Sequence, residues 1–220
     1  MNIIIPLCGI GKRFMEAGYN EPKPLIKIFN KLMIEHVIDC LKLHNNDKLF
    51  IIYHTSLDDY NFNNIIKNNY KNIFLIPISE RTNGAAETIL FGLNFIINNN
   101  MLISNECLLL DCDTIYNVDI IQKIKKQNTN SVLYFEDLDS KPIYSYIQMD
   151  NNNKIIDIIE KEKISNNANT GAYFFKDIFQ LRNGCAYIIN NNIKFKNEYY
   201  TSCVIKYMIN NSIDFYGIKI

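Results

Sequence analysis

Two glycines and three cations gather close to the amino end of the chain, directly after a short apolar run. The run NIIIP is followed by Gly9, Gly11, Lys12 and Arg13, and Lys23 stands between two prolines in EPKPL. Glycine lets a backbone approach a ligand and aim N–H groups at it, while Lys and Arg supply positive charge and hydrogen-bond donors. The spacing therefore predicts a site for a polyanionic tail such as a triphosphate.

Neither of two common phosphate-binding fingerprints fits this loop. The dinucleotide fingerprint would need Gly in place of Phe14, and the P-loop would need Gly at Pro6 and Ser or Thr at Arg13. An isolated GxG is by itself more typical of a strand-to-helix turn with solvated cations. The nearby PKPL segment favours ligand binding.

The stretch RTNGAAETIL has a composition suited to a flat ring lying against the backbone. Gly84 and Ala85 carry little or no side chain, which leaves space for such a ring. A plain helix start, with Thr82 or Asn83 as the N-cap, would also explain these residues. The sequence alone leaves both interpretations open.

The stretch LLLDCDT ends an apolar run with two carboxylates one residue apart. If the strand conformation continues, Asp111 and Asp113 point to opposite sides of it, and we expect only one of them to face a cleft. An aspartate at a strand end can hold a hard divalent ion, and turn formation or helix capping is the alternative.

The elements that must position these residues follow an alternating pattern. Apolar, β-branched runs at 3–6, 49–53, 73–77, 107–110 and 131–135 predict buried parallel strands, with helical periodicity between them. YSYIQM and KIIDII, joined by residues 150–153, predict a β-hairpin, and residues 172–175 a return to the sheet. Residues 200–210 show helical spacing. We expect an α/β fold with a Rossmann-like, mostly parallel mixed sheet and helices on its faces.

Composition limits the partners and the number of domains. The 220 residues and 48% hydrophobic content suit a single domain over 1–220, and 23 basic side chains balance 23 acidic ones. A broad attraction to nucleic acid or anionic lipid therefore has no basis, and no apolar stretch reaches the ~20 residues of a membrane span. Six scattered cysteines without a CxxC pair predict reduced thiols and a cytoplasmic protein. Self-association stays open.

The segments PLCGIGKRF and EPKPLIKIFNKLMIEHVI resemble the amino-terminal signature of the sugar-nucleotide pyrophosphorylase superfamily of nucleotidylyltransferases. The likeness is to the short cytidylyltransferases of capsule and surface-polysaccharide pathways, and it spans nearly the whole chain. It implies a nucleotide-diphospho-sugar transferase-like fold with the β-hairpin as an acceptor-side insertion. It also implies Mg²⁺ as cofactor, with a nucleoside triphosphate and a small phosphorylated acceptor as substrates.

The resemblance also implies roles for particular residues. It assigns catalysis to Lys12, Arg13 and Lys23, and magnesium binding to Asp113. It assigns nucleotide binding to Leu7, Gly9, Gly11, Thr82, Gly84, Ala85 and Asp111. It assigns acceptor binding to Glu160, Lys161, Asn169, Thr170 and Gly171, although the charges of EKEK alone are typical of a solvated strand end.

Three positions depart from the family pattern. Lys12 replaces a small hydroxyl residue, and Asp111 stands where relatives often carry Asn. In NEYYTSCVI, which resembles a later family segment, Cys203 stands where relatives often carry Asp. The chain ends at YGIKI rather than continuing into a WxxxGTP-type segment, so no second protein ligand for the metal is assigned.

The expected reaction joins a nucleoside monophosphate to the acceptor and releases pyrophosphate. CTP is the favoured nucleotide, and phosphocholine, a phospho-amino acid such as glutamine phosphate, and a sugar 1-phosphate are the candidate acceptors. An ionised phosphate nucleophile needs no general base, since alignment and charge stabilisation lower the barrier. The alternatives are a DxD-type glycosyltransferase, because of DCD, and a catalytically silent regulatory subunit.

Overall fold

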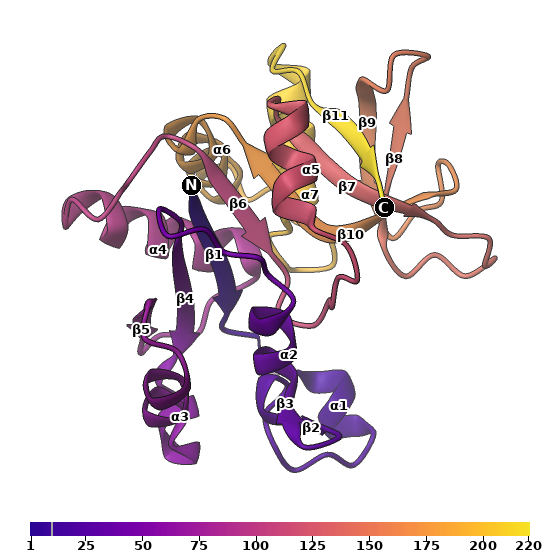
Figure 1. The fold of residues 1–220 in the computed structure, drawn as a ribbon. Helices are drawn as coiled ribbons and strands as arrows, with labels where there is room; N and C mark the ends of the chain where they lie inside the picture. Colours follow the sequence, from indigo (N-terminus) through magenta and orange to yellow (C-terminus); the bar gives the residue numbers. More distant parts are fainter. Residues whose placement is uncertain (10) are drawn as a thin grey trace.

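The apolar runs of the sequence form the strands of one nine-stranded mixed sheet (Figure 1). The structure is a computed structural model that describes residues 1–9 and 11–220; of Lys12 and Arg13 it describes only the backbone. The strands of this sheet are β1 (Asn2–Leu7), β4 (Lys48–His54), β5 (Ile73–Ile78), β6 (Cys107–Leu110), β7 (Ser131–Glu136), β8 (Ser145–Met149), β9 (Ile155–Glu160), β10 (Asn167–Phe175) and β11 (Tyr216–Lys219). A separate two-stranded sheet contains β2 (Lys27–Ile28) and β3 (Lys31–Leu32). The α-helices are α1 (Lys12–Glu16), α2 (Met33–Asp39), α3 (Phe62–Asn69), α4 (Ala85–Asn98), α5 (Ile120–Gln127), α6 (Ile178–Asn190) and α7 (Thr201–Asn210), with 3-10 helices η1 (Lys23–Leu25) and η2 (Thr55–Tyr60). The predicted α/β class with a mostly parallel sheet is confirmed.

The order of the strands creates a crevice beside β1. The order is β11-β7-β10-β6-β1-β4-β5, so the chain runs outward from β1 to β4 and β5 and then returns to β6 on the other side of β1. Parallel sheets bind ligands beyond the carboxyl ends of the strands at such a reversal point. The loops that follow β1 and β6 are therefore neighbours at the expected position of a site.

Pro6 helps to separate these two strands near their carboxyl ends. Proline has no N–H to donate to a neighbouring strand. β1 pairs with β6 only over Asn2–Ile4, although its pairing with β4 continues to Leu7. α1 and the β2–β3 hairpin extend beyond this end of the sheet (Figure 1).

β10 is the antiparallel strand of the central sheet. It pairs with β6 on one side and with β7 on the other, and it also contacts β8 of the β8–β9 hairpin. Because β10 runs opposite to β6, its first half lies at the carboxyl end of β6. Residues more than fifty positions apart in the sequence therefore meet at one edge.

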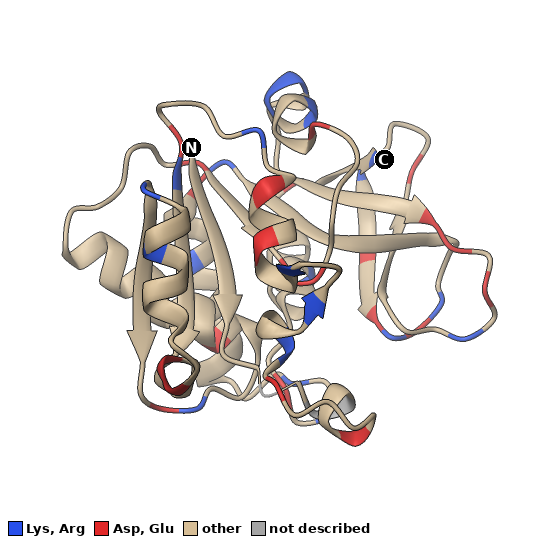
Figure 2. Cartoon of the chain, turned by 60° about the horizontal axis from the view of Figure 1, so that its bottom comes forward, with Lys and Arg blue, Asp and Glu red and all other residues tan. Residues whose placement is uncertain are grey.

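Helices cover both faces of the sheet, as the sequence predicts. α4, α6 and α7 pack on one face against residues such as Ile4 and Phe50, and α2, α3 and α5 pack on the other against residues such as Ile3 and Leu49. Successive strand residues point to opposite faces, so the uninterrupted apolar runs serve both layers. Lys and Arg are interspersed with Asp and Glu along the chain (Figure 2), in agreement with its balanced charge.

The hairpin predicted over 144–159 is confirmed, with strands at Ser145–Met149 and Ile155–Glu160 that lie within one residue of the expected bounds, and its turn follows from side-chain chemistry. The Asp150 carboxylate accepts hydrogen bonds from the backbone N–H groups of Asn152 at 2.8 Å and Lys154 at 3.0 Å. Asn153 adopts the left-handed conformation with φ +59°, which Asn tolerates better than most residues. The turn therefore fixes the register of the acceptor-side hairpin.

We expect Asp137→Asn to lower stability at neutral pH. Asp137 is 5% exposed and accepts a 2.6 Å hydrogen bond from the Tyr146 hydroxyl, which lowers the pKa of the carboxyl against the opposing effect of burial. A carboxyl with a lowered folded-state pKa contributes stability above its unfolded pKa of about 4, and that contribution is lost as the pH falls further. The urea midpoint of the variant should lie below that of wild type at pH 7, and the gap should narrow below about pH 4.

Asp59→Asn is the matched control for this prediction. Asp59 is exposed on η2 and forms no hydrogen bond or ion pair with any residue that the structure describes. Its replacement should leave the pH dependence of unfolding unchanged. A gap between Asp137→Asn and wild type that stayed constant from pH 7 to pH 3 would contradict the proposed linkage.

Candidate active site

The loop after β1 packs directly against the PKPL segment. Gly11 has φ +65°, and a Cβ added there would lie 3.0 Å from the Cβ of Lys23. Among the described residues other than its chain neighbours, none has a heavy atom within 4 Å of the position that a Cβ on Gly9 would take. Leu7 ends β1 and is buried. The predicted loop and the predicted lysine therefore meet, as a phosphate site requires.

Lys12 and Arg13 are predicted catalytic residues of the same loop. Their backbone begins α1, and the N–H of Phe14 bonds to the carbonyl of Gly11 at 2.8 Å. The side chains of Lys12 and Arg13, and the whole of Ile10, lie outside the part of the chain that the structure describes. Their predicted contacts with phosphate stay predictions.

Lys23 and the acidic turn after β6 form the electrostatic centre of the site. The Lys23 ammonium forms an ion pair and hydrogen bond with the Asp113 carboxylate, and 22% of the Lys23 side chain is exposed against 37% for Asp113. Burial alone would lower the pKa of Lys23, but Cys112, Asp113 and Asp111 together raise it above its ordinary value. The ammonium therefore stays charged at neutral pH.

Asp111 and Asp113 were expected to point to opposite sides only if the strand continued, and this condition is not met. β6 ends at Leu110, and the chain turns at once. Both carboxylates act electrostatically on Lys23 and on each other. Burial, then repulsion from Asp113, raises the pKa of Asp111 to about 7. The turn therefore concentrates negative charge that a cation would stabilise.

This pair of carboxylates fits a magnesium ion held jointly with a substrate. Among the described residues, no group of three His, Cys, Asp or Glu side chains forms a ready-made metal site. Mg²⁺ is typically held by one or two carboxylates, with water and substrate phosphate oxygens completing its shell. Asp113, with Asp111 beside it, supplies this kind of partial donor set.

The segment Asn169–Gly171 of β10 supports the acidic turn from behind. The N–H of Asp111 donates to the Gly171 carbonyl at 2.8 Å, and the Tyr116 hydroxyl donates to the Thr170 carbonyl at 3.1 Å. The Asn169 amide donates to the Ser145 hydroxyl at 2.9 Å. Asn169 and Thr170 are buried, and their side chains bond to Ser145 and to the Leu133 carbonyl. The structure thus shows that they support the acidic turn, while their role in acceptor binding stays a prediction.

Gly171 allows the closest approach in this region. Its φ is +85°, which strongly favours glycine, and a Cβ added there would lie 2.4 Å from an Asp111 carboxylate oxygen. The Gly171 N–H also donates to the Asn169 side chain at 2.9 Å. The position thus requires glycine because of both backbone conformation and space.

The turn before α4 begins the helix differently from the capping alternative. The N-cap is Gly84, with φ +134°, so neither Thr82 nor Asn83 caps the helix. The Thr82 hydroxyl instead bonds to the Thr88 hydroxyl at 2.7 Å, and the Asn83 N–H donates to Glu87. A Cβ on Gly84 would lie 2.6 Å from backbone atoms of Tyr199. The turn is therefore packed tightly against the segment before α7, and Ala85 begins the helix.

The predicted acceptor residues Glu160 and Lys161 lie at the end of β9. Lys161 donates to the Tyr200 hydroxyl at 2.6 Å and lies 3.7 Å from the Glu160 carboxylate, which accepts from the Ser202 hydroxyl at 2.8 Å. Burial raises the pKa of Glu160, partly offset by Ser202 and Lys161. A hollow of about 160 Å³ adjoins them, lined by Ile158, Ile159, Glu160, Lys194, Phe195, Ser202, Cys203 and Lys206.

Sequence reasoning missed Tyr116, Tyr200 and Ser202. Tyr116 holds β10 to the acidic turn, while Tyr200 and Ser202 hold the ends of the Lys161 and Glu160 side chains. NEYYTS was noticed only as a family-like segment. Four adjacent residues with hydroxyl groups, 199–202, at the start of an amphipathic helix were the available signal.

The cysteines do not supply a reactive thiolate. All six are free. Burial raises the pKa of the Cys8 thiol to about 11 and that of Cys112 to about 12. Thiols react as thiolates, so these two are poor nucleophiles near neutral pH.

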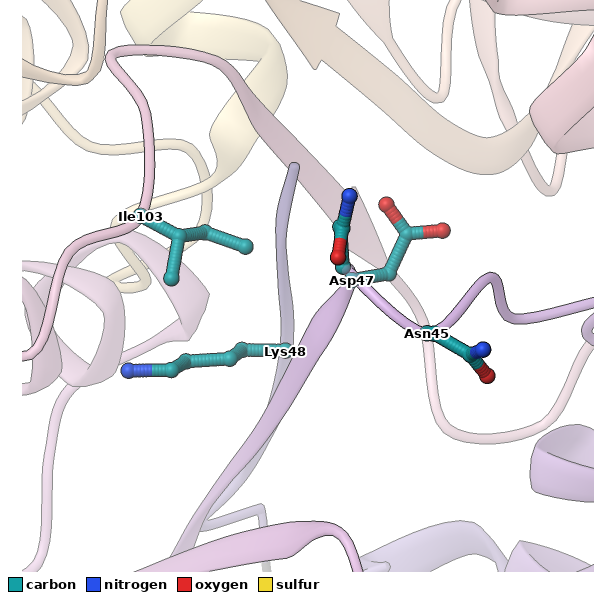
Figure 3. A pocket seen from close by; sticks show the side chains of 5 residues that line it. Asn45, Asp47, Lys48 and Ile103 are labelled. Atoms are coloured by element: carbon teal, nitrogen blue, oxygen red, sulfur yellow. The ribbon is translucent and has the colours of Figure 1, made fainter.

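A larger hollow of about 410 Å³ lies at the other end of the strands. Asn45, Asn46, Asp47, Lys48 and Ile103 line it, near the amino end of β4 (Figure 3). Because ligands of such sheets bind beyond the carboxyl ends of the strands, the hollow is distinct from the candidate site.

Within the described residues, no helix combines the length and apolarity needed to cross a membrane.

The fold and the arrangement of loops around its reversal point define a Rossmann-like nucleotidyltransferase fold. The chain belongs to the Nucleotidyl transferase family, whose sequence profile matches residues 3–189. The expected superfamily resemblance is confirmed.

The curated relatives include proteins named Bifunctional protein GlmU. That of Methanococcus aeolicus is 28% identical over 182 residues, which are 80% of this chain and 40% of the relative. That of Thermosipho melanesiensis is 28% identical over 217 residues, which are 96% of this chain and 45% of the relative. The chain thus spans about two fifths of the length of these relatives.

Solved structures share the fold over almost the whole chain. A nucleoside-diphosphate-sugar pyrophosphorylase from Vibrio cholerae superposes with a TM-score of 0.83 at 19% identity, covering 99% of this chain and 91% of that one. The inositol-1-phosphate CTP transferase from T. maritima gives a TM-score of 0.71 at 12% identity, covering 99% and 84%. At these identities the likeness shows the fold alone.

Proposed function

We propose that this protein transfers a nucleoside monophosphate from a pyrimidine nucleoside triphosphate to a small phosphorylated acceptor. The observation that carries the proposal is the meeting of Lys23 with Asp111 and Asp113, where Gly11 of the loop after β1 packs on Lys23. A triphosphate tail needs such a combination of N–H donors, a fixed cation and carboxylates that hold a divalent ion.

In the proposed reaction, an acceptor phosphate oxygen attacks the α-phosphorus of the nucleotide. The bond between the α-phosphorus and the bridging oxygen to the β-phosphate breaks, and pyrophosphate leaves with that electron pair. The attacking oxygen is already ionised, so no proton must be removed. Positioning and charge stabilisation then supply most of the barrier reduction.

The residues divide between the two substrates. Gly9 and Gly11 present backbone N–H groups to the phosphates, and Lys12 and Arg13 bind the departing pyrophosphate. Lys23 neutralises charge near the reacting phosphorus. Asp113, assisted by Asp111, would hold Mg²⁺, which when bound neutralises phosphate charge.

The remaining residues serve the base and the acceptor. Leu7, Thr82, Gly84 and Ala85 border the base and ribose, and the Tyr199 backbone fills the space where a Gly84 side chain would lie. Lys161 binds the acceptor phosphate, and Glu160, Asn169, Thr170 and Gly171 shape the pocket around it. The hollow of about 160 Å³ beside Glu160 supports an acceptor on this side of the sheet.

Comparisons with known proteins support a pyrimidine nucleotide without selecting one. Three solved structures that share the fold are named for glucose-1-phosphate thymidylyl transfer, for UDP-glucose and for CTP. CTP remains our first choice for this chain, and capsule or surface-polysaccharide synthesis remains the proposed pathway. UTP is the closest competitor.

Charge in the acceptor region ranks the candidate acceptors. Lys161 lies over the rings of Tyr200 and Phe195, and Lys194 lies over the ring of Tyr199, with nitrogen-to-centroid distances of 4.5, 5.9 and 4.5 Å. A quaternary ammonium group usually binds aromatic faces, which here already face lysine cations. We therefore rank a sugar 1-phosphate or a phospho-amino acid above phosphocholine.

The decisive assay measures pyrophosphate release with Mg²⁺, each common nucleoside triphosphate, and a panel of phosphorylated acceptors. We expect release with CTP or UTP and one acceptor class, and Asp113→Asn should raise the Mg²⁺ concentration needed for nucleotide binding, measured by calorimetry. Glycosyl transfer from a nucleotide sugar without pyrophosphate release would instead favour the glycosyltransferase alternative. The absence of any triphosphate binding would overturn the proposal.

A further inference from the structure

The segment Tyr199–Ser202 joins the two substrate sides of the proposed site. On the nucleotide side, the Tyr199 N–H donates to the Asn83 carbonyl at 2.7 Å, and the Ala86 N–H donates to the Tyr199 carbonyl at 3.0 Å. The close approach to Gly84 described above leaves little freedom in this pairing. The base-side turn therefore fixes the backbone from which Tyr200 projects.

On the acceptor side, the same segment holds the two charged residues at the end of β9. Tyr200 accepts the 2.6 Å hydrogen bond from Lys161, and Ser202 donates the 2.8 Å hydrogen bond to Glu160. The Tyr200 ring also packs edge-on against Phe195, with 6.0 Å between centroids. Tyr200 is thus held both by the backbone beside it and by an aromatic neighbour.

Tyr200 accepts the short hydrogen bond of the Lys161 ammonium, which also lies near Glu160 and over the rings of Tyr200 and Phe195. The Lys161 backbone is in the left-handed region with φ +51°, stabilised by a 2.8 Å hydrogen bond from its N–H to the Tyr144 carbonyl. Non-glycine residues in this region are uncommon and tend to occur at functional sites. The ammonium has three donors, of which Tyr200 takes one, while Glu160 lies farther away at 3.7 Å. Donors remain for an anionic ligand.

We infer that Tyr200 is a positioning residue that aims the Lys161 ammonium at the acceptor phosphate. The inference rests on the proposed function, in which Lys161 binds that phosphate. The phenol acts through Lys161 rather than on the reacting atoms. The position of Tyr200 depends on the turn before α4, which borders the proposed base site. The segment Tyr199–Ser202 therefore fixes the distance between the two proposed substrates.

The test compares wild type, Tyr200→Phe and Lys161→Met with inorganic phosphate as the probe. Phosphate binding is measured by calorimetry or ³¹P line broadening. The phosphate binding that Lys161→Met loses relative to wild type is assigned to Lys161. We expect Tyr200→Phe to weaken this binding at Lys161 by about 5- to 10-fold, the effect of losing one hydrogen bond to a charged group. Affinity for CTP and UTP and the thermal midpoint should stay unchanged, which a merely structural role would not predict.

Tyr207→Phe is the matched control. Tyr207 lies on the same helix and stacks on Tyr187 at 3.9 Å, and its hydroxyl makes no hydrogen bond within the described residues. The Tyr207→Phe variant should bind phosphate as wild type does.

If Tyr200→Phe bound phosphate as wild type does while Lys161→Met lost binding, the positioning role of Tyr200 would be overturned and the proposed function would stand. Equal phosphate binding in wild type and Lys161→Met would overturn the acceptor assignment of the proposed function as well. A lower thermal midpoint or weaker nucleotide binding in Tyr200→Phe would show a structural role and overturn positioning.

Discussion

Replacing Lys23 by Met is expected to lower the rate of the proposed nucleotidyl transfer by about 10²- to 10³-fold, because a fixed donor to developing charge is removed from a sheltered site. Lys23 is held at the reversal point of the sheet by η1 and by its ion pair with Asp113. Met has a side chain of similar length to Lys but carries no charge. Steady-state kinetics with the active substrate pair measure the effect, and circular dichroism checks the fold.

The same substitution has a second readout that does not depend on turnover. Without the ammonium, Asp111 and Asp113 lose the nearest described cation, so Mg²⁺ should bind the free protein more tightly. Lys27→Met is the control, because Lys27 is exposed on β2. Full activity of Lys23→Met would remove Lys23 from the proposed machinery, even if its metal affinity changed.

Replacing Gly171 by Ala should reduce both stability and activity strongly. The new Cβ would lie 2.4 Å from the Asp111 carboxylate and 2.8 Å from the Asp111 Cβ, so β10 and the acidic turn must move apart. We expect a loss of about 2–4 kcal/mol in the free energy of unfolding, as is usual for overpacking combined with backbone strain. Urea unfolding measures this loss, and nucleotide-dependent Mg²⁺ binding measures displacement of the carboxylates.

Gly18→Ala separates strain from collision. Gly18 also has a left-handed backbone, with φ +90°, but a Cβ there would have no heavy atom within 4 Å. The Gly18→Ala substitution should lower the free energy of unfolding by only the conformational penalty of about 1–2 kcal/mol and leave Mg²⁺ binding intact. If Gly171→Ala were no more damaging than Gly18→Ala, the close packing of Gly171 on Asp111 would have no energetic importance.

Local patterns predicted the parts of the fold that depend on neighbouring residues. The run Cys107–Leu110 forms a strand with the expected bounds, and the hairpin forms around Asp150 because its side chain closes the turn. The meeting of the GxG loop with Lys23 was predicted through the resemblance of the two segments. Their proximity is now explained by the packing of Gly11 on Lys23.

Other features depended on contacts that a linear pattern does not contain. α6 was not predicted, although Asp177 caps it, because the apolar spacing of residues 178–190 was not recognised as helical. β11 was missed because its pairing partner, β7, lies far away in the sequence. The sequence did not show whether the strand continues through Asp111; in the structure β6 ends at Leu110, and the Asp111 N–H bonds to Gly171 of β10.

The antiparallel course of β10 has a consequence for biosynthesis. A nascent chain that has emerged only as far as β7 already contains Lys23 and both aspartates, but lacks the strand that lies between β6 and β7. Domains that pair distant strands gain these contacts late, after the loop entropy has been overcome. The support that Gly171 gives to Asp111 therefore cannot form until residues 167–175 have been synthesised, so the candidate site is completed only after most of the polypeptide has been made.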